Sequence, residues 1–200
     1  MGPIAIRPQA SGDDGYSRAD TSAFATDGAN GFIGELSGVG PGAYIDWFSR
    51  YTNVQIPAGA TITDAYVVFK ASSSDTADTV CTKFGFCAAD SPAAPTSFGE
   101  HAALTRTTMV DWDFTTNWVN DTLYSTTGLI DLTSALQEVI DRPGWALGNA
   151  LILLIDDDGS SADAERWFDS YDGDPTAAPQ LNVTFTEAVT GGTTTFITCF

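Results

Sequence analysis

The chain has 200 residues, the length of a single domain, and 43% of them are hydrophobic, enough for a substantial core. Twenty-six acidic residues against eight basic ones give a formal net charge of −18. Such a surface repels phosphate backbones and anionic headgroups, so we expect neither nucleic acid nor a membrane as a partner. The opening MGPIAIRPQA lacks a basic segment followed by an apolar stretch, so we expect no signal peptide.

The N-terminal segment, residues 1–42, is weakly patterned. It is rich in Gly, Ala, Asp and Ser, which favours an arm and loops belonging to the same domain as the rest of the chain. One short strand is expected at residues 4–8. Ile4 and Ile6 in that strand are candidates for contact with another subunit.

From residue 43 onward the pattern becomes strand-like. AYIDWFSRYTNVQI is followed by a Pro/Gly turn, and TITDAYVVFKA then alternates with a period of two. That alternation places one set of side chains on a single buried face: Ala65, Val67, Phe69 and Ala71. The other expected strands lie at residues 43–56, 78–90, 149–156, 164–171 and 179–187, and residues 105–114 and 117–125 are expected to be either strands or a long connection.

One helix is predicted in DLTSALQEVIDRPGW. Asp131 is its candidate N-cap, and Pro143-Gly144 ends it. Its expected buried stripe consists of Leu132, Leu136, Val139 and Ile140.

Many short strands with one interrupting helix predict an all-β fold, an antiparallel jelly-roll β-sandwich with extended N- and C-terminal segments. We assign residues 43–187 to the sandwich and residues 188–200 to a C-terminal extension strand after the Gly191-Gly192 hinge. The extension is expected either to pair with the sheet edge of another subunit or to form a last edge strand on its own sandwich. Its candidate contact residues are Phe196, Ile197 and Phe200.

Three segments carry a resemblance to a known family: SRYTNVQIPAGATITDAYVVF, LTSALQEVIDRPGWALGNALILLI and RWFDSYDGDPTAAPQLNVTF. Over residues 43–186 the chain resembles DNRLRE-type modules, which are related to family 96 carbohydrate-binding modules. The resemblance implies a jelly roll of the kind found in large extracellular proteins and in some phage structural proteins. It bears on fold more than on function, because each matched segment also has a purely structural explanation. The family's modules are usually appended to other domains, whereas this chain is nearly all module.

The sequence predicts no catalytic site. His101 is the only histidine, it follows a proline-broken stretch, and no G-x-S-x-G motif occurs. We therefore expect His101 to be an exposed loop residue and the protein not to be an enzyme.

The aspartate-rich stretch DDDGSSAD has two interpretations. Asp156, Asp158 and Asp163 are oxygen ligands of the type that calcium prefers, which makes calcium the one candidate cofactor. The alternative is a polar hairpin loop between two strands, since the spacing does not match an EF-hand.

The tryptophans also have two interpretations, a sugar-stacking platform or core packing. The platform candidates are Trp47, Trp112, Trp118 and, further along, Trp167.

Arg166 and the cysteines carry structural expectations. If Arg166 is buried, it is expected to pair with a carboxylate, because an unpaired buried charge is very costly. Cys81 and Cys87 lie about 20 Å apart on one extended strand, too far for a disulfide, so both are expected to be buried free thiols.

The function expected from these patterns is a non-enzymatic structural protein of an assembly. A phage virion component is the first candidate, as a capsid decoration, head-fibre or tail protein whose partners are itself and other virion subunits. The alternative is a carbohydrate-binding or adhesion module, extracellular or on a cell surface, with glycans as partners.

Overall fold

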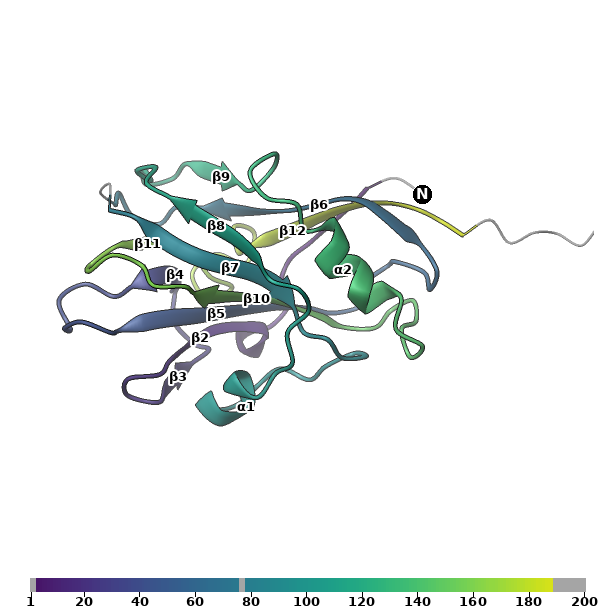
Figure 1. Cartoon of the computed structure of the whole chain (residues 1–200), viewed down its shortest axis with the longest axis horizontal. Coiled ribbons are helices and arrows are strands. Elements are labelled where there is room, and N and C mark those ends of the chain that lie inside the picture. Colours follow the sequence, from purple (N-terminus) through teal and green to yellow (C-terminus); the bar gives the residue numbers. More distant parts are fainter. Residues whose placement is uncertain (1–2, 76–77, 189–200) are drawn as a thin grey trace, which may run out of the picture.

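The computed structural model describes residues 3–75 and 78–188, and in them the chain is an antiparallel β-sandwich with two short helices. Figure 1 shows β9, β6 and β12 along one side of the molecule and β2, β3 and α1 along the opposite side. The all-β prediction is therefore confirmed, while the jelly-roll connectivity stays a prediction.

The strands are β1 (Ile4–Ile6), β2 (Asp14–Arg18), β3 (Ala23–Ala25), β4 (Asn30–Glu35), β5 (Tyr44–Tyr51), β6 (Thr61–Lys70), β7 (Val80–Phe86), β8 (Val110–Phe114), β9 (Leu123–Ser125), β10 (Leu151–Asp157), β11 (Glu165–Asp169) and β12 (Gln180–Thr186). The helices are α1 (Phe98–Ala102) and α2 (Thr133–Ile140), with a 3-10 turn at Ser11–Asp13.

The smaller sheet has the strand order β1-β12-β6-β9. Its centre is the long pairing of β12 with β6, in which Leu181 lies opposite Val67 and Val183 opposite Ala65. These side chains are buried because a strand turns alternate residues to the same face. β1 and β9 form the two edges, each three residues long.

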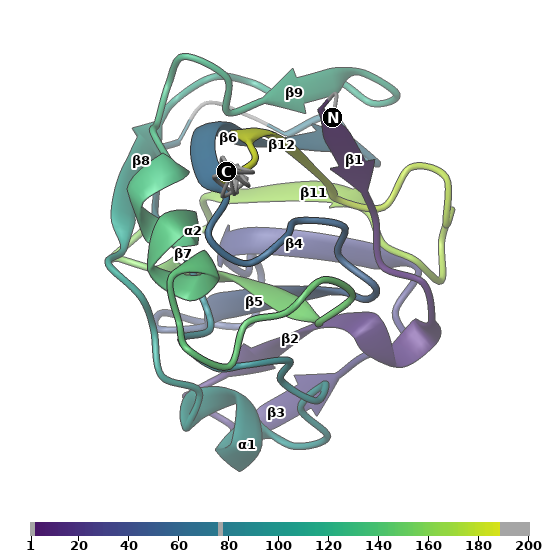
Figure 2. The same cartoon turned by 90° about the vertical axis from the view of Figure 1, so that its right-hand side faces the viewer.

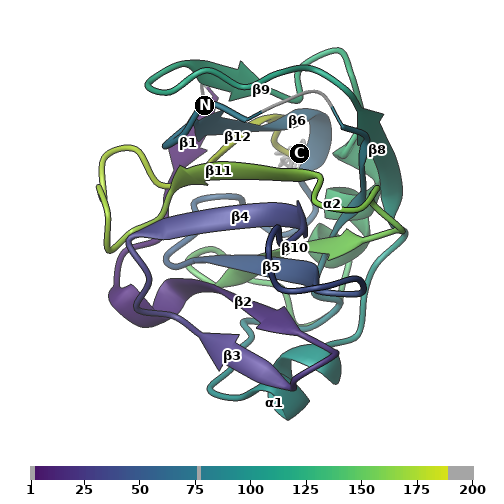
Figure 3. The same ribbon diagram turned by 90° about the vertical axis from the view of Figure 1, so that its left-hand side faces the viewer.

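The larger sheet has the order β11-β4-β5-β10-β7-β8, and β2 and β3 join it through β5. Figure 3 shows β11, β4, β5, β2 and β3 one below another. On one edge β5 pairs with β2, and on the other it pairs first with β4 and then, from Trp47, with β10. Because its neighbour changes along its length, β5 pairs with three strands, β2, β4 and β10.

The main core lies between the two sheets, and α2 closes one end of it (Figure 2). The predicted helical stripe is confirmed, since all four of its side chains are at most 1% exposed. Phe69 is the centre of an aromatic cluster, with its ring 4.9 Å from that of Phe168 and 5.8 Å from that of Trp118. A second, smaller cluster lies around Phe48 and Ile152, where the segments of β3 and α1 pack against it.

The expectation that residues 1–42 form an arm and loops is wrong, because β2, β3 and β4 are strands of the larger sheet. The apolar alternation of β4 is interrupted by two glycines that the packing requires. A Cβ on Gly31 would lie 2.3 Å from the Phe168 ring, and Gly34 has φ +103° and contacts the Ala164 backbone. Close packing around β4 therefore requires glycine at two positions where side chains would otherwise have shown the alternation typical of a strand.

The predicted assembly residues divide into two groups. Ile4 and Ile6 are half-buried and pack on the chain's own core, while β1 pairs with β12 of the same chain. Their prediction as contacts with another subunit is thus not supported by the geometry. Phe196, Ile197 and Phe200 lie outside the described residues.

Within the described ranges, no helix combines the length and apolar character needed to cross a membrane.

Candidate functional site

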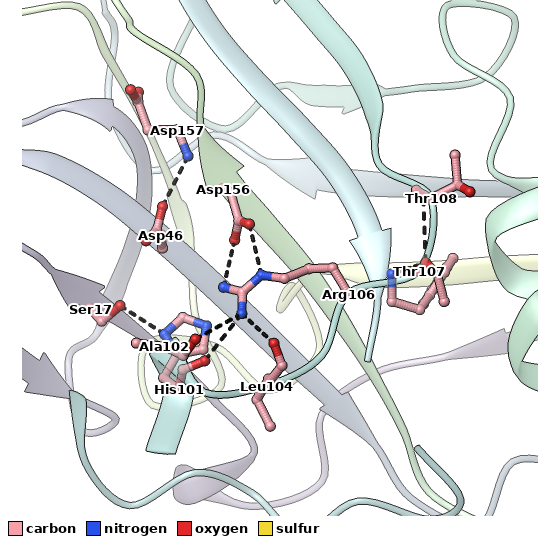
Figure 4. A network of polar contacts seen from close by, with 11 residues as sticks. Ser17, Asp46, His101, Ala102, Leu104, Arg106, Thr107, Thr108, Asp156 and Asp157 are labelled. Carbon is pink, nitrogen blue, oxygen red and sulfur yellow. Dashed lines mark hydrogen bonds and ion pairs between the residues drawn. The ribbon is translucent and has the colours of Figure 1, made fainter. Parts of the chain in front are cut away.

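A network of polar contacts lies where the α1 segment meets the outer face of the larger sheet (Figure 4). α1 begins where Ser97 accepts a hydrogen bond from the Glu100 amide and the Glu100 carboxylate accepts one from the Thr96 amide. Such reciprocal capping stabilises a short helix start. The helix carries His101 inward, so that its Nδ1 lies 2.8 Å from Oγ of Ser17 on β2.

His101 is fully buried, so the expectation of an exposed loop position is wrong. Its ring packs against Phe48 at 5.1 Å and faces Phe24 at 6.5 Å. Burial, with the positive charge of Arg106 close by, lowers the pKa of His101 to about 4. The imidazole is therefore neutral at neutral pH.

Arg106 links the α1 segment to β10 of the larger sheet. Its guanidinium donates to both oxygens of Asp156 on β10, at 2.9 and 3.1 Å, and its Nη1 donates to the carbonyls of Ala102 and Leu104. Bidentate pairs of this kind fix orientation as well as adding energy. Burial and the neighbouring Asp156 raise the pKa of Asp46 to about 6.

The Ser17–His101 pair has the spacing of a nucleophile and a base, but it is enclosed. Ser17 is 1% exposed and His101 0%, and Nε2 of His101 has no hydrogen-bond partner among the described residues. A substrate has no access to a pair buried in this way. The geometry fits a structural role, in which the pair joins α1 to β2.

The structure does not bring the three predicted calcium ligands together. Asp156 binds Arg106, Asp158 lies 2.7 Å from Lys83, and the Asp163 carboxylate accepts from the Gly38 amide. In residues 3–75 and 78–188, no group of three or more His, Cys, Asp or Glu side chains is arranged to hold a metal ion. The geometry supports the polar-loop interpretation.

Asp163 does line an acidic hollow of about 430 Å³ near the start of β11. Asp75 and Glu165 line it too, yet Asp75 accepts from the Trp167 amide at 2.9 Å and Glu165 accepts from Ser37 Oγ at 2.8 Å. These carboxylates therefore hold neighbouring backbone and loops in place.

Three of the predicted platform tryptophans belong to the core. Trp47, Trp112 and Trp118 are 1%, 6% and 1% exposed, so the core-packing interpretation is confirmed for them and the sugar-platform interpretation is wrong. Trp167 is only partly buried. Its ring lies 4.7 Å from that of Phe32, which lies 4.9 Å from that of Tyr16.

Arg166 is buried, as its strand position suggested, but its expected carboxylate partner is replaced by backbone carbonyls. It donates to the carbonyl oxygens of Thr116, Glu165 and Asp78 at 3.0, 2.7 and 3.2 Å. Its guanidinium also lies over the ring of Phe114, 5.5 Å from the centroid. The prediction of an ion pair was therefore wrong. Cys81 and Cys87 are free thiols as predicted, but only Cys87 is buried, while Cys81 is partly exposed.

The edge strand β9 is bordered by exposed apolar side chains that the sequence analysis did not single out. Leu123 on β9 is 65% exposed, Val119 before it 55%, and Leu129 after it 63%. Within residues 3–75 and 78–188, β6 is the only strand that pairs with β9, so the other edge of β9 has no strand partner there. An open edge with apolar neighbours has the character of an association surface.

No model of a known protein family matches this chain, and no curated protein sequence matches it.

Proposed function

We propose that this protein is a non-enzymatic structural subunit of an assembly, with a phage virion component as the first candidate. The resemblance of residues 43–186 to modules found in phage structural proteins supports this class. The observation that carries the proposal is the β9 edge, where open backbone groups and exposed leucines meet on one side of the molecule.

The β9 edge is unusual for the free surface of a soluble domain. Exposed edge strands are normally protected by charged side chains, prolines or a covering segment. Here the exposed apolar side chains of Val119, Leu123 and Leu129 lie in and around β9, and the charges next to them, Asp121 and Lys70, are paired with each other. Pairing with a strand of another subunit would satisfy the open backbone groups and bury these apolar side chains.

The test is the association state of the Leu123→Asp variant, measured by size-exclusion chromatography with light scattering over a range of concentrations. We expect the wild type to form a defined oligomer and Leu123→Asp to shift toward monomer while its circular dichroism spectrum shows the same β content, since the melting temperature itself depends on association. Leu147→Asp is the matched control, because Leu147 is 54% exposed but lies in the loop between α2 and β10. A wild type that stays monomeric, or an oligomer that tolerates Leu123→Asp, would contradict the proposal.

A glycan-binding module is the second candidate, and the partly exposed Trp167 favours it. The Trp167 ring packs on the buried ring of Phe32, which holds it in place, and its own partly exposed surface is of the kind on which a pyranose ring stacks. Soluble polysaccharides should then change the tryptophan fluorescence of the wild type but not of Trp167→Ala. Tyr44→Ala removes another exposed aromatic ring and should leave binding unchanged.

A further inference from the structure

Among the described residues of this acidic protein, one basic side chain has no hydrogen-bond or ion-pair partner. The chain has eight lysines and arginines, all within the described ranges, and seven of them donate to carboxylates or backbone carbonyls. The exception is Arg7, which directly follows β1. The engaged side chains are Arg18 with Asp20, Arg50 with Asp13, Arg106 with Asp156, Arg142 with Asp90, Lys70 with Asp121 and Asp169, Lys83 with Asp158, and Arg166 with three carbonyl oxygens.

The Arg7 guanidinium is partly withdrawn from solvent. Its Nε is buried, and no acceptor for it is found in residues 3–75 or 78–188. Burial lowers the pKa of Arg7, and the electrostatic influence of Tyr51 and Asp174 opposes that effect only in part. A buried charged donor without an acceptor is unfavourable, so this site is incomplete as it stands.

Arg7 lines an open hollow of about 620 Å³ between the β1 segment and the chain that follows β5. The other lining residues are Ala5, Ile6, Gln9, Thr52 and Asn53, and none of them is acidic. This differs from the hollow near β11, in which Asp75, Asp78, Asp163 and Glu165 are all wall residues. In a chain of net charge −18, a hollow with an arginine and no carboxylate is a local exception.

Further hydrogen-bond donors stand beside Arg7. Asn53 Oδ1 accepts from Gln55 Nε2 at 2.8 Å, so the Asn53 NH₂ group is left to donate elsewhere. Thr52, which carries a hydroxyl, lines the hollow as well. A guanidinium, an amide and a hydroxyl together suit a ligand that only accepts hydrogen bonds, which is the property of an ionised carboxylate.

We propose that this hollow is a carboxylate-binding site in which Arg7 holds the carboxylate through its planar fork of N–H groups. Arginine binds carboxylates through two parallel hydrogen bonds, a geometry that lysine cannot reproduce. The carboxylate belongs either to a free small molecule or to an acidic side chain of a second copy of this chain. The proposal does not depend on the β9 edge, because β1 and β9 are opposite edges of the smaller sheet.

The first experiment follows the arginine Nε–H signals by ¹H–¹⁵N NMR during titration with sodium succinate, with sodium chloride keeping the ionic strength constant. We expect the Arg7 signal to shift and saturate while the signals of the other arginines stay in place. In Arg7→Gln, succinate binding should weaken at least about ten-fold, the lower bound for losing a charge-assisted hydrogen bond. Arg18→Gln is the matched control, since Arg18 is engaged by Asp20 and does not line the hollow.

Two further variants and one further ligand sharpen this test. Arg7→Lys keeps the charge but loses the fork, so it should also bind succinate more weakly than the wild type. Both Arg7 variants should fold, because Arg7 has no internal partner to lose, and unchanged melting temperatures would verify this. Inorganic phosphate that binds as tightly as succinate would overturn the preference for a carboxylate.

The second experiment distinguishes the two sources of the carboxylate. If a second copy supplies it, Arg7→Gln should weaken self-association in sedimentation velocity, and succinate should compete with association of the wild type. This effect should persist in the Leu123→Asp background, which separates it from association at the β9 edge. If succinate leaves the Arg7 signal unmoved and Arg7→Gln leaves self-association unchanged, the proposal is wrong.

Discussion

Replacement of Asp14 by asparagine should stabilise the protein, and only at high pH. Asp14 begins β2 and is 1% exposed. Its Oδ2 accepts a hydrogen bond from the Tyr171 amide at 2.9 Å, while its Oδ1 is buried without a partner among the described residues. Burial, together with the nearby Asp172 and Asp13 carboxylates, raises the pKa of Asp14 to about 7, although the Tyr171 hydrogen bond opposes the rise.

The sign and size of the effect follow from proton linkage. The unfolded chain releases this proton near the ordinary value of 3.8, whereas the folded protein keeps it up to about 7. The contribution of Asp14 to the free energy of unfolding therefore falls as the pH rises from about 4 to about 7, and it is level above that range. At roughly 1.4 kcal/mol per pKa unit, the ionised carboxylate costs up to about 4 kcal/mol at pH 8. Asparagine avoids this cost, keeps an acceptor for Tyr171 and cannot ionise.

The assay is urea denaturation of the wild type and Asp14→Asn at pH 4 and pH 8. We expect the variant to be more stable by up to about 4 kcal/mol at pH 8 and nearly equal to the wild type at pH 4. Asp20→Asn is the control, because Asp20 is exposed, its pKa is lowered by Arg18, and its loss should bring no gain at pH 8. A variant less stable than the wild type at pH 8, or a gain of the same size at both pH values, would refute the reasoning.

Two further predictions concern the packing. Ser17→Ala should lower the free energy of unfolding by about 1–3 kcal/mol, because it leaves His101 Nδ1 buried without its 2.8 Å partner; equal stability in urea would show that this contact is energetically neutral. Phe69→Ala should cost about 3–5 kcal/mol, because Phe69 is fully buried and packs against the rings of Phe84, Trp112 and Phe168. Thermal denaturation checks this second prediction, and a loss below about 1 kcal/mol would contradict a tightly packed aromatic centre.

The candidate sites were less predictable from sequence than the fold, since each depends on residues far apart in the chain. His101 belongs to a five-residue helix, and its partner Ser17 is 84 residues away. Arg7 was not singled out at all, whereas its neighbours Ile4 and Ile6 were. Nothing in a linear pattern indicates that one arginine lacks an acid within reach, because pairing is a property of positions in space.

The tryptophans show the same limit from another direction. Trp112 and Trp118 suggested a sugar platform by residue type alone, yet both are buried in the core around Phe69. Type predicts what a side chain is able to do, but exposure decides whether it does so. Only the packed structure distinguished Trp167, which stays partly exposed, from the rest.

By itself, the sequence determined the elements whose pattern is local and complete. The period-two alternation of Leu181, Val183 and Phe185 specified β12, and the stripe from Leu132 to Ile140 specified α2, since one buried face repeats within each element. The tertiary structure decided the rest. It placed β2, β3 and β4 in the larger sheet, and in β4 two glycines stand where side chains would have shown the alternation. Among the described residues it also left the Arg7 side chain unpaired and the outer edge of β9 without a strand partner, because strand neighbours and charge partners are chosen only when distant segments meet.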